Sequence, residues 1–184
     1  MTTPMEILSR EHRIIECVLR ALDGICLRIE RGETIPAQPL SEIVDFIRTF
    51  ADRFHHEKEE QHLFPTLEEY GVPRQGGPIG VMLYEHQLGR QLVAEMHQAA
   101  QSYADGNAGA ANDFVTAARQ YLELLSVHIY KEDNVLFKIS GNVLSNDALN
   151  SLNKDFAEVA SRFGADAYAR YEQLAKELEK DWAR

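Results

Sequence analysis

The sequence predicts an all-α protein, an antiparallel up-down four-helix bundle with additional C-terminal helices. Three observations support this fold class. Apolar residues recur at alternating steps of three and four, as they do along one face of an α-helix. The alternation of apolar and polar residues that is typical of strands is absent from the sequence. Segments rich in glycine and proline divide the helical pattern into four long stretches followed by two shorter ones.

The first two helices are predicted from their start signals and apolar stripes. Thr3, Pro4 and Glu6 indicate a capping box with proline at the first helical position. The stripe of the first helix runs up to Arg31-Gly32 through Leu8, His12, Ile15, Leu19, Leu22, Cys26 and Ile29. The stripe of the second helix runs up to Pro65 through Leu40, Val44, Ile47, Ala51, His55 and Glu59. Each helix therefore points a histidine inward.

The remaining helices are separated by two predicted loops. The loop at 70–80 precedes a third helix, which begins near Ile79 and carries on one face Met82, His86, Arg90 and Val93. A loop at 105–109 leads to a fourth helix with the stripe Phe114, Ala118, Tyr121, Leu125, His128, Glu132 and Val135. Two shorter helices, roughly 146–161 and 165–182, form a covering appendage without histidine.

Length and composition indicate a single domain. With 184 residues, of which 45% are hydrophobic, the chain can form one sizeable core, and a second full domain would be hard to fit. We expect residues 1–140 to form the bundle and residues 141–184 to form a helical extension packed on the same domain.

Charge and cysteine usage limit the class of partner. The formal net charge is −10 and no basic cluster occurs, which argues against nucleic acid or a membrane surface as the main partner. The N-terminus has no apolar signal core, and no stretch approaches the ~20 apolar residues of a membrane span, so we expect a cytosolic protein. The spacing of Cys17 and Cys26 indicates neither a thiolate zinc site nor a disulfide framework, and Cys26 is predicted to be buried. Small molecules or ions remain as ligands.

A repeated histidine and acid motif is the most informative feature of the sequence. The chain contains His55-x-x-x-Glu59-Glu60-x-x-Leu63-Phe64 and, 73 residues later, His128-x-x-x-Glu132-Asp133-x-x-Leu136-Phe137. Each copy follows a Glu-His pair, which is Glu11-His12 for the first and Glu85-His86 for the second. The chain therefore resembles a doubled metal-binding half.

The repeated residues are predicted to meet inside the bundle. Counted from the shared end at ~1.5 Å per residue, the four inward histidines lie within about one turn of the same level. Glu59 and Glu132 follow a histidine by four residues and share its face. The candidate metal ligands are His12, His55, Glu59, His86, His128 and Glu132. These ligand types favour iron, manganese or zinc over calcium, and two carboxylates from opposite helices suit bridging of two divalent ions.

The alternative is that these residues are hydrogen-bonded members of an ordinary core. One inward histidine would fit that interpretation. Two buried glutamates argue against it, because an unpaired buried carboxylate costs several kcal/mol.

Three further histidines have to be placed. His56 is followed by Glu60 at the same spacing, but only His55 stands in the same position relative to the Leu-Phe pair as His128 does. We therefore place His56 on the flank of the helix. His62 and His97 have no repeat partner and are predicted to be structural or surface residues. A ferritin-type site would need a second Glu-x-x-His pair, which the sequence lacks.

With these residues in place, the chain resembles the hemerythrin-like (HHE cation-binding) family. The family pattern is a histidine, His-x-x-x-Glu-Glu-x-x-Leu-Phe-Pro, a histidine, and then His-x-x-x-Glu or Asp; residues 3–137 carry all of it. The resemblance implies a non-haem di-iron centre with two iron ions, or another divalent metal, inside a four-helix bundle.

One position departs from the oxygen-carrying members of the family. They have a fifth histidine four residues after the third, where this chain has Arg90. The resemblance then implies two histidines on each iron, His12 with His55 and His86 with His128, bridged by Glu59 and Glu132. Arg90 would neutralise a bridging carboxylate, stabilise a bound anion, or form a salt bridge to Glu59 or Glu132 on the helix flank. Tyr121 would act near the metals or pack in the core.

Several functions fit these residues. The first is a sensor or binder that takes dioxygen, nitric oxide or peroxide as a small ligand. The alternatives are an oxidoreductase acting on peroxide or on reactive nitrogen and oxygen species, an iron-handling protein, and a purely structural bundle. No catalytic residue is assigned, because binding and turnover need the same ligands and an open position.

Overall fold

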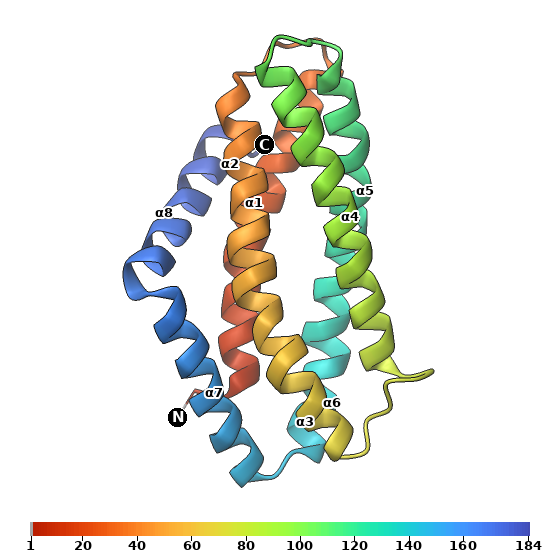
Figure 1. The fold of residues 1–184 in the computed structure, drawn as a ribbon, viewed down its shortest axis with the longest axis vertical. Helices are drawn as coiled ribbons and strands as arrows, with labels where there is room; N and C mark the ends of the chain where they lie inside the picture. Colours follow the sequence, from red (N-terminus) through yellow and green to blue (C-terminus); the bar gives the residue numbers. More distant parts are fainter. Residues whose placement is uncertain (1) are drawn as a thin grey trace.

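A computed structural model describes residues 2–184, which form helices joined by short loops (Figure 1). No strand occurs among these residues, so the prediction of an all-α protein is confirmed. None of the helices in this part of the chain combines the length and the apolar character needed to cross a membrane.

The helices follow one another in four long segments and two shorter ones. The first segment is α1, Pro4–Glu30. The second joins α2 (Ala37–Phe46), η1 (Ile47–His56), η2 (Glu59–Leu63) and α3 (Phe64–Glu69). The third is α4, Pro78–Ala104, and the fourth joins α5 (Ala110–Lys131), η3 (Glu132–Leu136) and α6 (Phe137–Val143). The chain ends with α7 (Asn146–Phe163) and α8 (Ala165–Trp182). The three η segments are π-helical, with hydrogen bonds from residue i to i+5.

The helix α1 begins and ends as predicted. The Thr3 hydroxyl accepts a hydrogen bond from the Glu6 backbone N–H, and the Glu6 carboxylate accepts one from the Thr3 N–H, which completes the capping box. Gly32 follows the helix with φ of 82°, in the left-handed region that glycine adopts without steric cost.

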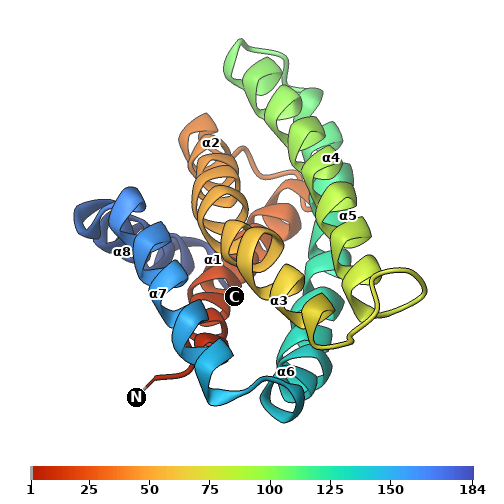
Figure 2. The same ribbon diagram turned by 60° about the horizontal axis from the view of Figure 1, so that its bottom comes forward.

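The long helices lie side by side, and the C-terminal pair covers one flank (Figures 1 and 2). The most extensive packing joins α4 to α5 across their short connection, and α1 packs on α5. On its other side α1 packs on α8, which also contacts α2. The two predicted C-terminal helices are thus confirmed, and α8 buries Tyr171, Ala175 and Leu178 in the main core.

The core consists of two apolar clusters with a polar layer between them. The larger cluster includes Ile15, Phe54 and Leu125, and the smaller includes Leu8, Leu63, Phe64, Met82, Leu136 and Phe137. The repeated Leu-Phe pairs therefore share one cluster. Every predicted ligand histidine lies in sequence between members of the two clusters, so these histidines form the layer where the clusters meet.

The end predicted for the second helix is wrong. That helix was expected to stop at Pro65, but the helical segment continues through α3 to Glu69. Pro65 lies directly after π-helical η2, where the backbone hydrogen bonds change from the π to the α pattern. Cys26 is fully buried, as predicted, and both cysteines are free thiols.

Candidate metal centre

The six predicted ligand residues meet at one level of the fold. His12 lies on α1, His55 on η1, His86 on α4 and His128 on α5, while Glu59 begins η2 and Glu132 begins η3. None of the six is more than 2% exposed. Four helical segments thus place imidazoles and carboxylates in the polar layer between the two apolar clusters.

The four histidines form two pairs. The ring centroids of His12 and His55 are 4.7 Å apart, and those of His86 and His128 are 4.8 Å apart. The Nε2 atoms of His86 and His128 approach to 3.1 Å. The pairs correspond to the two halves of the sequence repeat.

Each glutamate lies between the two pairs. The oxygens of Glu59 are 3.6 Å from His55 Nε2 and 3.5 Å from His86 Nε2. One oxygen of Glu132 is 3.2 Å from His12 Nε2 and 3.4 Å from His128 Nε2. Each carboxylate therefore contacts one histidine of each pair, which is the placement that bridging requires.

The polar atoms at the centre of this layer are unpaired. Within residues 2–184, both oxygens of Glu59, both oxygens of Glu132 and His12 Nε2 are buried without a hydrogen-bond partner. The 3.2 Å approach of His12 to Glu132 is close but not aligned for a hydrogen bond. Burial of unpaired carboxylates is costly, and a set of imidazole and carboxylate donors suits divalent transition metals. These residues fit a metal centre.

An outer carboxylate orients each of the four histidines through Nδ1. The pairs are His12 with Asp133 (2.9 Å), His55 with Glu11 (2.9 Å), His86 with Glu60 (2.7 Å) and His128 with Glu85 (2.9 Å). Metal-binding histidines characteristically donate their second ring N–H to a carboxylate, which fixes the tautomer. Here it makes Nε2 the ring nitrogen that faces the two glutamates.

A cation lies behind each outer carboxylate. Glu11 accepts from Lys58 at 2.5 Å, Glu60 accepts from Arg90 at 2.7 Å, and the two remaining ion pairs are Glu85 with Lys131 and Asp133 with Arg13. Lys58 is only 1% exposed. The chain thus surrounds its histidines with fixed carboxylates, each held in place by a second charge.

The predicted partners of Arg90 are wrong. A contact with the bridging carboxylates Glu59 or Glu132 was expected, but Arg90 pairs with Asp52 and Glu60 and is 43% exposed. Its alternative role, stabilising a bound anion, stays a prediction. Glu60 follows Glu59 in η2, and its carboxylate contacts the two α4 residues His86 and Arg90. It therefore binds the guanidinium before that group can reach Glu59 or Glu132. Arg90 therefore acts on the histidines through carboxylates and does not contact the central glutamates.

The predicted flank position of His56 is also wrong. His56 is 7% exposed and stacks on His86, with ring centroids 3.7 Å apart and an interplanar angle of 13°. The cause is η1, since a π-helix rotates less per residue than an α-helix and carries consecutive side chains, here His55 and His56, to the same interior. His62 is partly exposed, 3.8 Å from Asp155, as expected of a surface residue.

Burial is the largest cause of the pKa shifts at the site. It lowers the pKa of His55 and His86 well below the usual value, and neighbouring histidines add to the effect. Burial raises the pKa of Glu59 well above its usual value, and the adjacent Glu132 carboxylate raises it further. For His12, burial is outweighed by its two carboxylate neighbours, which raise the pKa to about 9. His55 and His86 are thus neutral near pH 7, as metal coordination requires.

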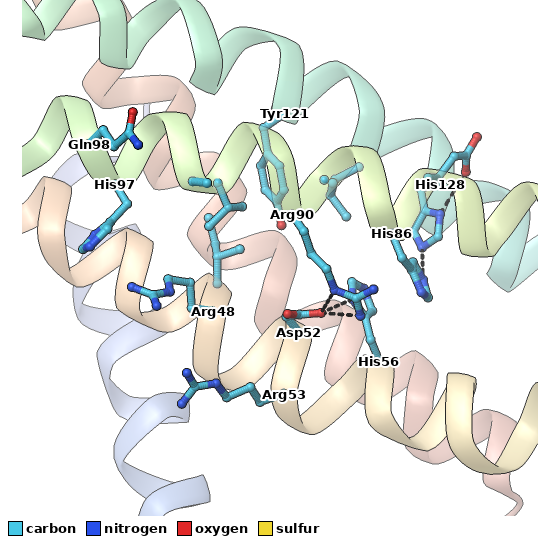
Figure 3. A pocket seen from close by; sticks show the side chains of 16 residues that line it. Arg48, Asp52, Arg53, His56, His86, Arg90, His97, Gln98, Tyr121 and His128 are labelled. Carbon is cyan, nitrogen blue, oxygen red and sulfur yellow. Dashed lines mark hydrogen bonds and ion pairs between the residues drawn. The ribbon is translucent and has the colours of Figure 1, made fainter.

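A cavity of about 380 Å³ adjoins one half of the site (Figure 3). His56, His86 and His128 line one end of it, and Arg48 and His97 line the other. The buried ring of Tyr121 also lines this cavity and packs in the core, as one of its two predicted roles requires. A role near the metals stays a prediction. A small molecule has room beside the His86 and His128 pair.

The outer carboxylates were not identified as site residues from the sequence. All four occupy repeated positions. Glu11 and Glu85 directly precede the first histidine of each half, and Glu60 and Asp133 directly follow the central glutamate of each half. Acids that recur in both halves beside candidate ligands were the signal available. Lys58 and Lys131 recur in the same way.

Comparison with known proteins confirms the predicted resemblance. The family model described as "Hemerythrin HHE cation binding domain" matches residues 3–139. A protein of Mycobacterium bovis described as uncharacterized is 27% identical over 179 residues, which is 97% of this chain and 69% of that protein. A Mycobacterium tuberculosis protein, also described as uncharacterized, gives the same values. The iron-sulfur cluster repair protein DnrN of Neisseria gonorrhoeae is 27% identical over 138 residues, 71% of this chain and 85% of its own length. No solved structure matches the chain.

Proposed function

Because this chain belongs to the hemerythrin HHE cation-binding domain family, we propose that it is a non-haem di-iron protein that binds a small ligand such as dioxygen, nitric oxide or peroxide. In this proposal one iron is held by His12 and His55 and the other by His86 and His128. Glu59 and Glu132 would supply carboxylate oxygens to both. Another divalent metal could take the place of iron.

The two buried glutamates carry the proposal. Their four oxygens lie among four imidazoles without a hydrogen-bond partner in the described residues. A pair of divalent cations would supply the missing positive charge and restore the interactions that burial removed. The outer carboxylates support the same view, because they hold the imidazoles in the tautomer that binds metal.

The proposed fold is the antiparallel four-helix bundle of the family. The four bundle helices are α1, the segment from α2 to α3, α4, and the segment from α5 to α6. We assign the metal-binding bundle to residues 1–140 and the extension on its flank to residues 141–184. The extension packs on α1, α2, η1 and η2, whereas the cavity is lined by residues of η1, α4 and α5. No residue of the extension lines the cavity.

Bound iron would supply an open coordination position and a change of redox state, and the chain supplies the rest. The shared Leu-Phe cluster closes one side of the histidine layer against water. Phe137 stacks on His12, and Phe64 stacks on His86, which restricts both imidazoles. The cavity beside His86 and His128 has space for a diatomic ligand or peroxide. These features support ligand binding at a rigid, enclosed centre.

The test is metal analysis combined with spectroscopy. We expect two iron ions per purified chain and a visible spectrum that changes reversibly when air is admitted and removed, and when azide is added. A spectrum that changes once in air and never returns would exclude reversible binding of dioxygen. A metal content near zero after purification without chelator would contradict the metal centre itself.

Iron handling is a second candidate, favoured by the relative named as an iron-sulfur cluster repair protein. It predicts that the reduced protein donates iron to an apo iron-sulfur protein faster than free chelated iron does. An oxidoreductase acting on peroxide or reactive nitrogen species is the third, favoured by the cavity beside one histidine pair. Unchanged peroxide decomposition in a Glu132→Ala variant would argue against that third candidate.

A further inference from the structure

We propose that His56 is a fifth imidazole ligand of the centre and that its Nε2 binds the metal held by His86 and His128. The inference rests on the proposed metal centre and refines it. The centre would then have two histidines on one metal and three on the other.

Proximity is the first observation. One ring nitrogen from each of His56, His86 and His128 lies within 4.8 Å of the other two, and all three residues are buried. The separate set of His12, His55, Glu59 and Glu132 meets the same limit. The buried donors therefore divide into two groups, one for each proposed metal position, and His56 belongs to the second.

Orientation is the second observation. His56 Nδ1 lies 3.2 Å from Asp52 Oδ1, the same nitrogen-to-carboxylate arrangement that orients the four other buried histidines. Because Asp52 accepts a hydrogen bond from Nδ1–H, the lone pair of the neutral imidazole lies on Nε2. A second charge holds this carboxylate as well, since Arg90 Nε donates to Asp52 at 2.8 Å. His56 thus has both a carboxylate at Nδ1 and a cation behind that carboxylate, as the other proposed histidine ligands do.

The same arrangement is missing at a histidine nearby on the chain. His62 approaches the half-exposed Asp155 only to 3.8 Å, and its side chain is 25% exposed. Carboxylate support is therefore a property of the buried histidines at the centre and not of every histidine in this protein. His62 provides a matched control.

Packing is the competing explanation. The ring of His56 lies face to face with that of His86 and could serve only to position it. A phenylalanine at position 56 preserves a stacking ring and removes the donor nitrogen. An alanine at position 56 removes the ring and opens a space that free imidazole can enter.

The experiment loads wild type, His56→Phe and His62→Phe with Co²⁺ and follows metal content and visible absorption during chelator competition. We expect wild type and His62→Phe to bind two ions with the same spectrum. In His56→Phe, one ion should be lost at a chelator concentration at least about tenfold lower, with a changed Co²⁺ spectrum. Two ions bound as tightly as in wild type, with the same spectrum, would overturn the proposal. Failure of the wild type to bind any metal would instead overturn the proposed function.

Imidazole rescue separates ligation from stacking. Added imidazole should restore the second ion and the wild-type Co²⁺ spectrum in His56→Ala. Loss of the ion that imidazole does not reverse counts against ligation. Thermal unfolding of the metal-free variants shows whether each one folds. Midpoints close to that of wild type are expected for the two phenylalanine variants, and a lower midpoint is expected for His56→Ala because of the space it opens.

Discussion

Arg90 Nη2 lies 2.7 Å from Glu60 Oε1, and this same oxygen lies 2.7 Å from His86 Nδ1. One carboxylate oxygen therefore links a surface arginine to a buried imidazole. Since Arg90 also holds Asp52, which contacts His56, a single guanidinium orients two histidines on the same side of the centre.

Replacement of Arg90 should weaken only one half of the metal centre. In Arg90→Met the carboxylates of Asp52 and Glu60 lose their common partner, and we expect metal affinity at the His86 side to fall about 10- to 100-fold. Chelator competition should then release one metal early and the other at the wild-type concentration. The control is Arg119→Met, which breaks ion pairs with Asp23 and Glu30 on another part of the surface. Equal weakening of both metals in Arg90→Met would contradict this expectation.

The central glutamates should destabilise the protein when metal is absent. Two carboxylates buried together without partners raise the free energy of the metal-free fold, and metal binding stabilises it in proportion to RT ln(1 + [L]/Kd). We expect the thermal midpoint of the wild type to rise when metal is added. Glu59→Gln should raise the midpoint of the metal-free protein and reduce the gain on adding metal. Differential scanning calorimetry checks both, and a metal-free midpoint that falls in Glu59→Gln would refute the argument.

The sequence predicted the fold class and the inner residues because both follow from periodicity. The stripe of steps of three and four placed the predicted ligand histidines inside, and the repeated Leu-Phe pair selected His55 as a ligand. His56 was misplaced because the argument assumed an α-helix throughout. The π-helical η1 has no recognised sequence signal, and it brings His56 inside.

The partners of Arg90 were missed for a different reason. Its position on the inward stripe of α4 suggested a contact with the central glutamates. Two acids on the neighbouring segment, Asp52 and Glu60, compete for the guanidinium at a more exposed place, where a charge keeps part of its hydration. Periodicity along one helix carries no information about such contacts between helices.

Lys58 should be essential for stability while its counterpart in the other half is not. Lys58 and Glu11 are both almost fully buried, so Lys58→Met leaves an uncompensated buried carboxylate at a cost of about 3–5 kcal/mol. Lys131→Met breaks the equivalent pair with Glu85, but that lysine is 29% exposed, and the cost should stay below about 1 kcal/mol. Urea denaturation of the metal-free proteins measures both. The double variant Lys58→Met with Glu11→Gln should recover most of the loss, because glutamine removes the buried charge and keeps an acceptor for His55 Nδ1. Equal effects of the two lysine substitutions would contradict the role of burial.

The effect of Gly24→Ala on stability should depend on the close packing of α1 against the end of α8. A Cβ atom at this position would collide with the backbone carbonyl of Trp182 at the end of α8. We expect Gly24→Ala to cost about 1–3 kcal/mol through overpacking, despite the better helix propensity of alanine. In a chain that ends at residue 180 the collision is absent, and the same substitution should stabilise by about 0.4–1 kcal/mol. Gly141→Ala, where a Cβ meets nothing within 4 Å, is the control and should be neutral or stabilising in both chains. The decisive result is that Gly24→Ala lowers the free energy of unfolding in the full chain and raises it in the shortened chain. A change in helix propensity alone would act in the same direction with and without the end of α8.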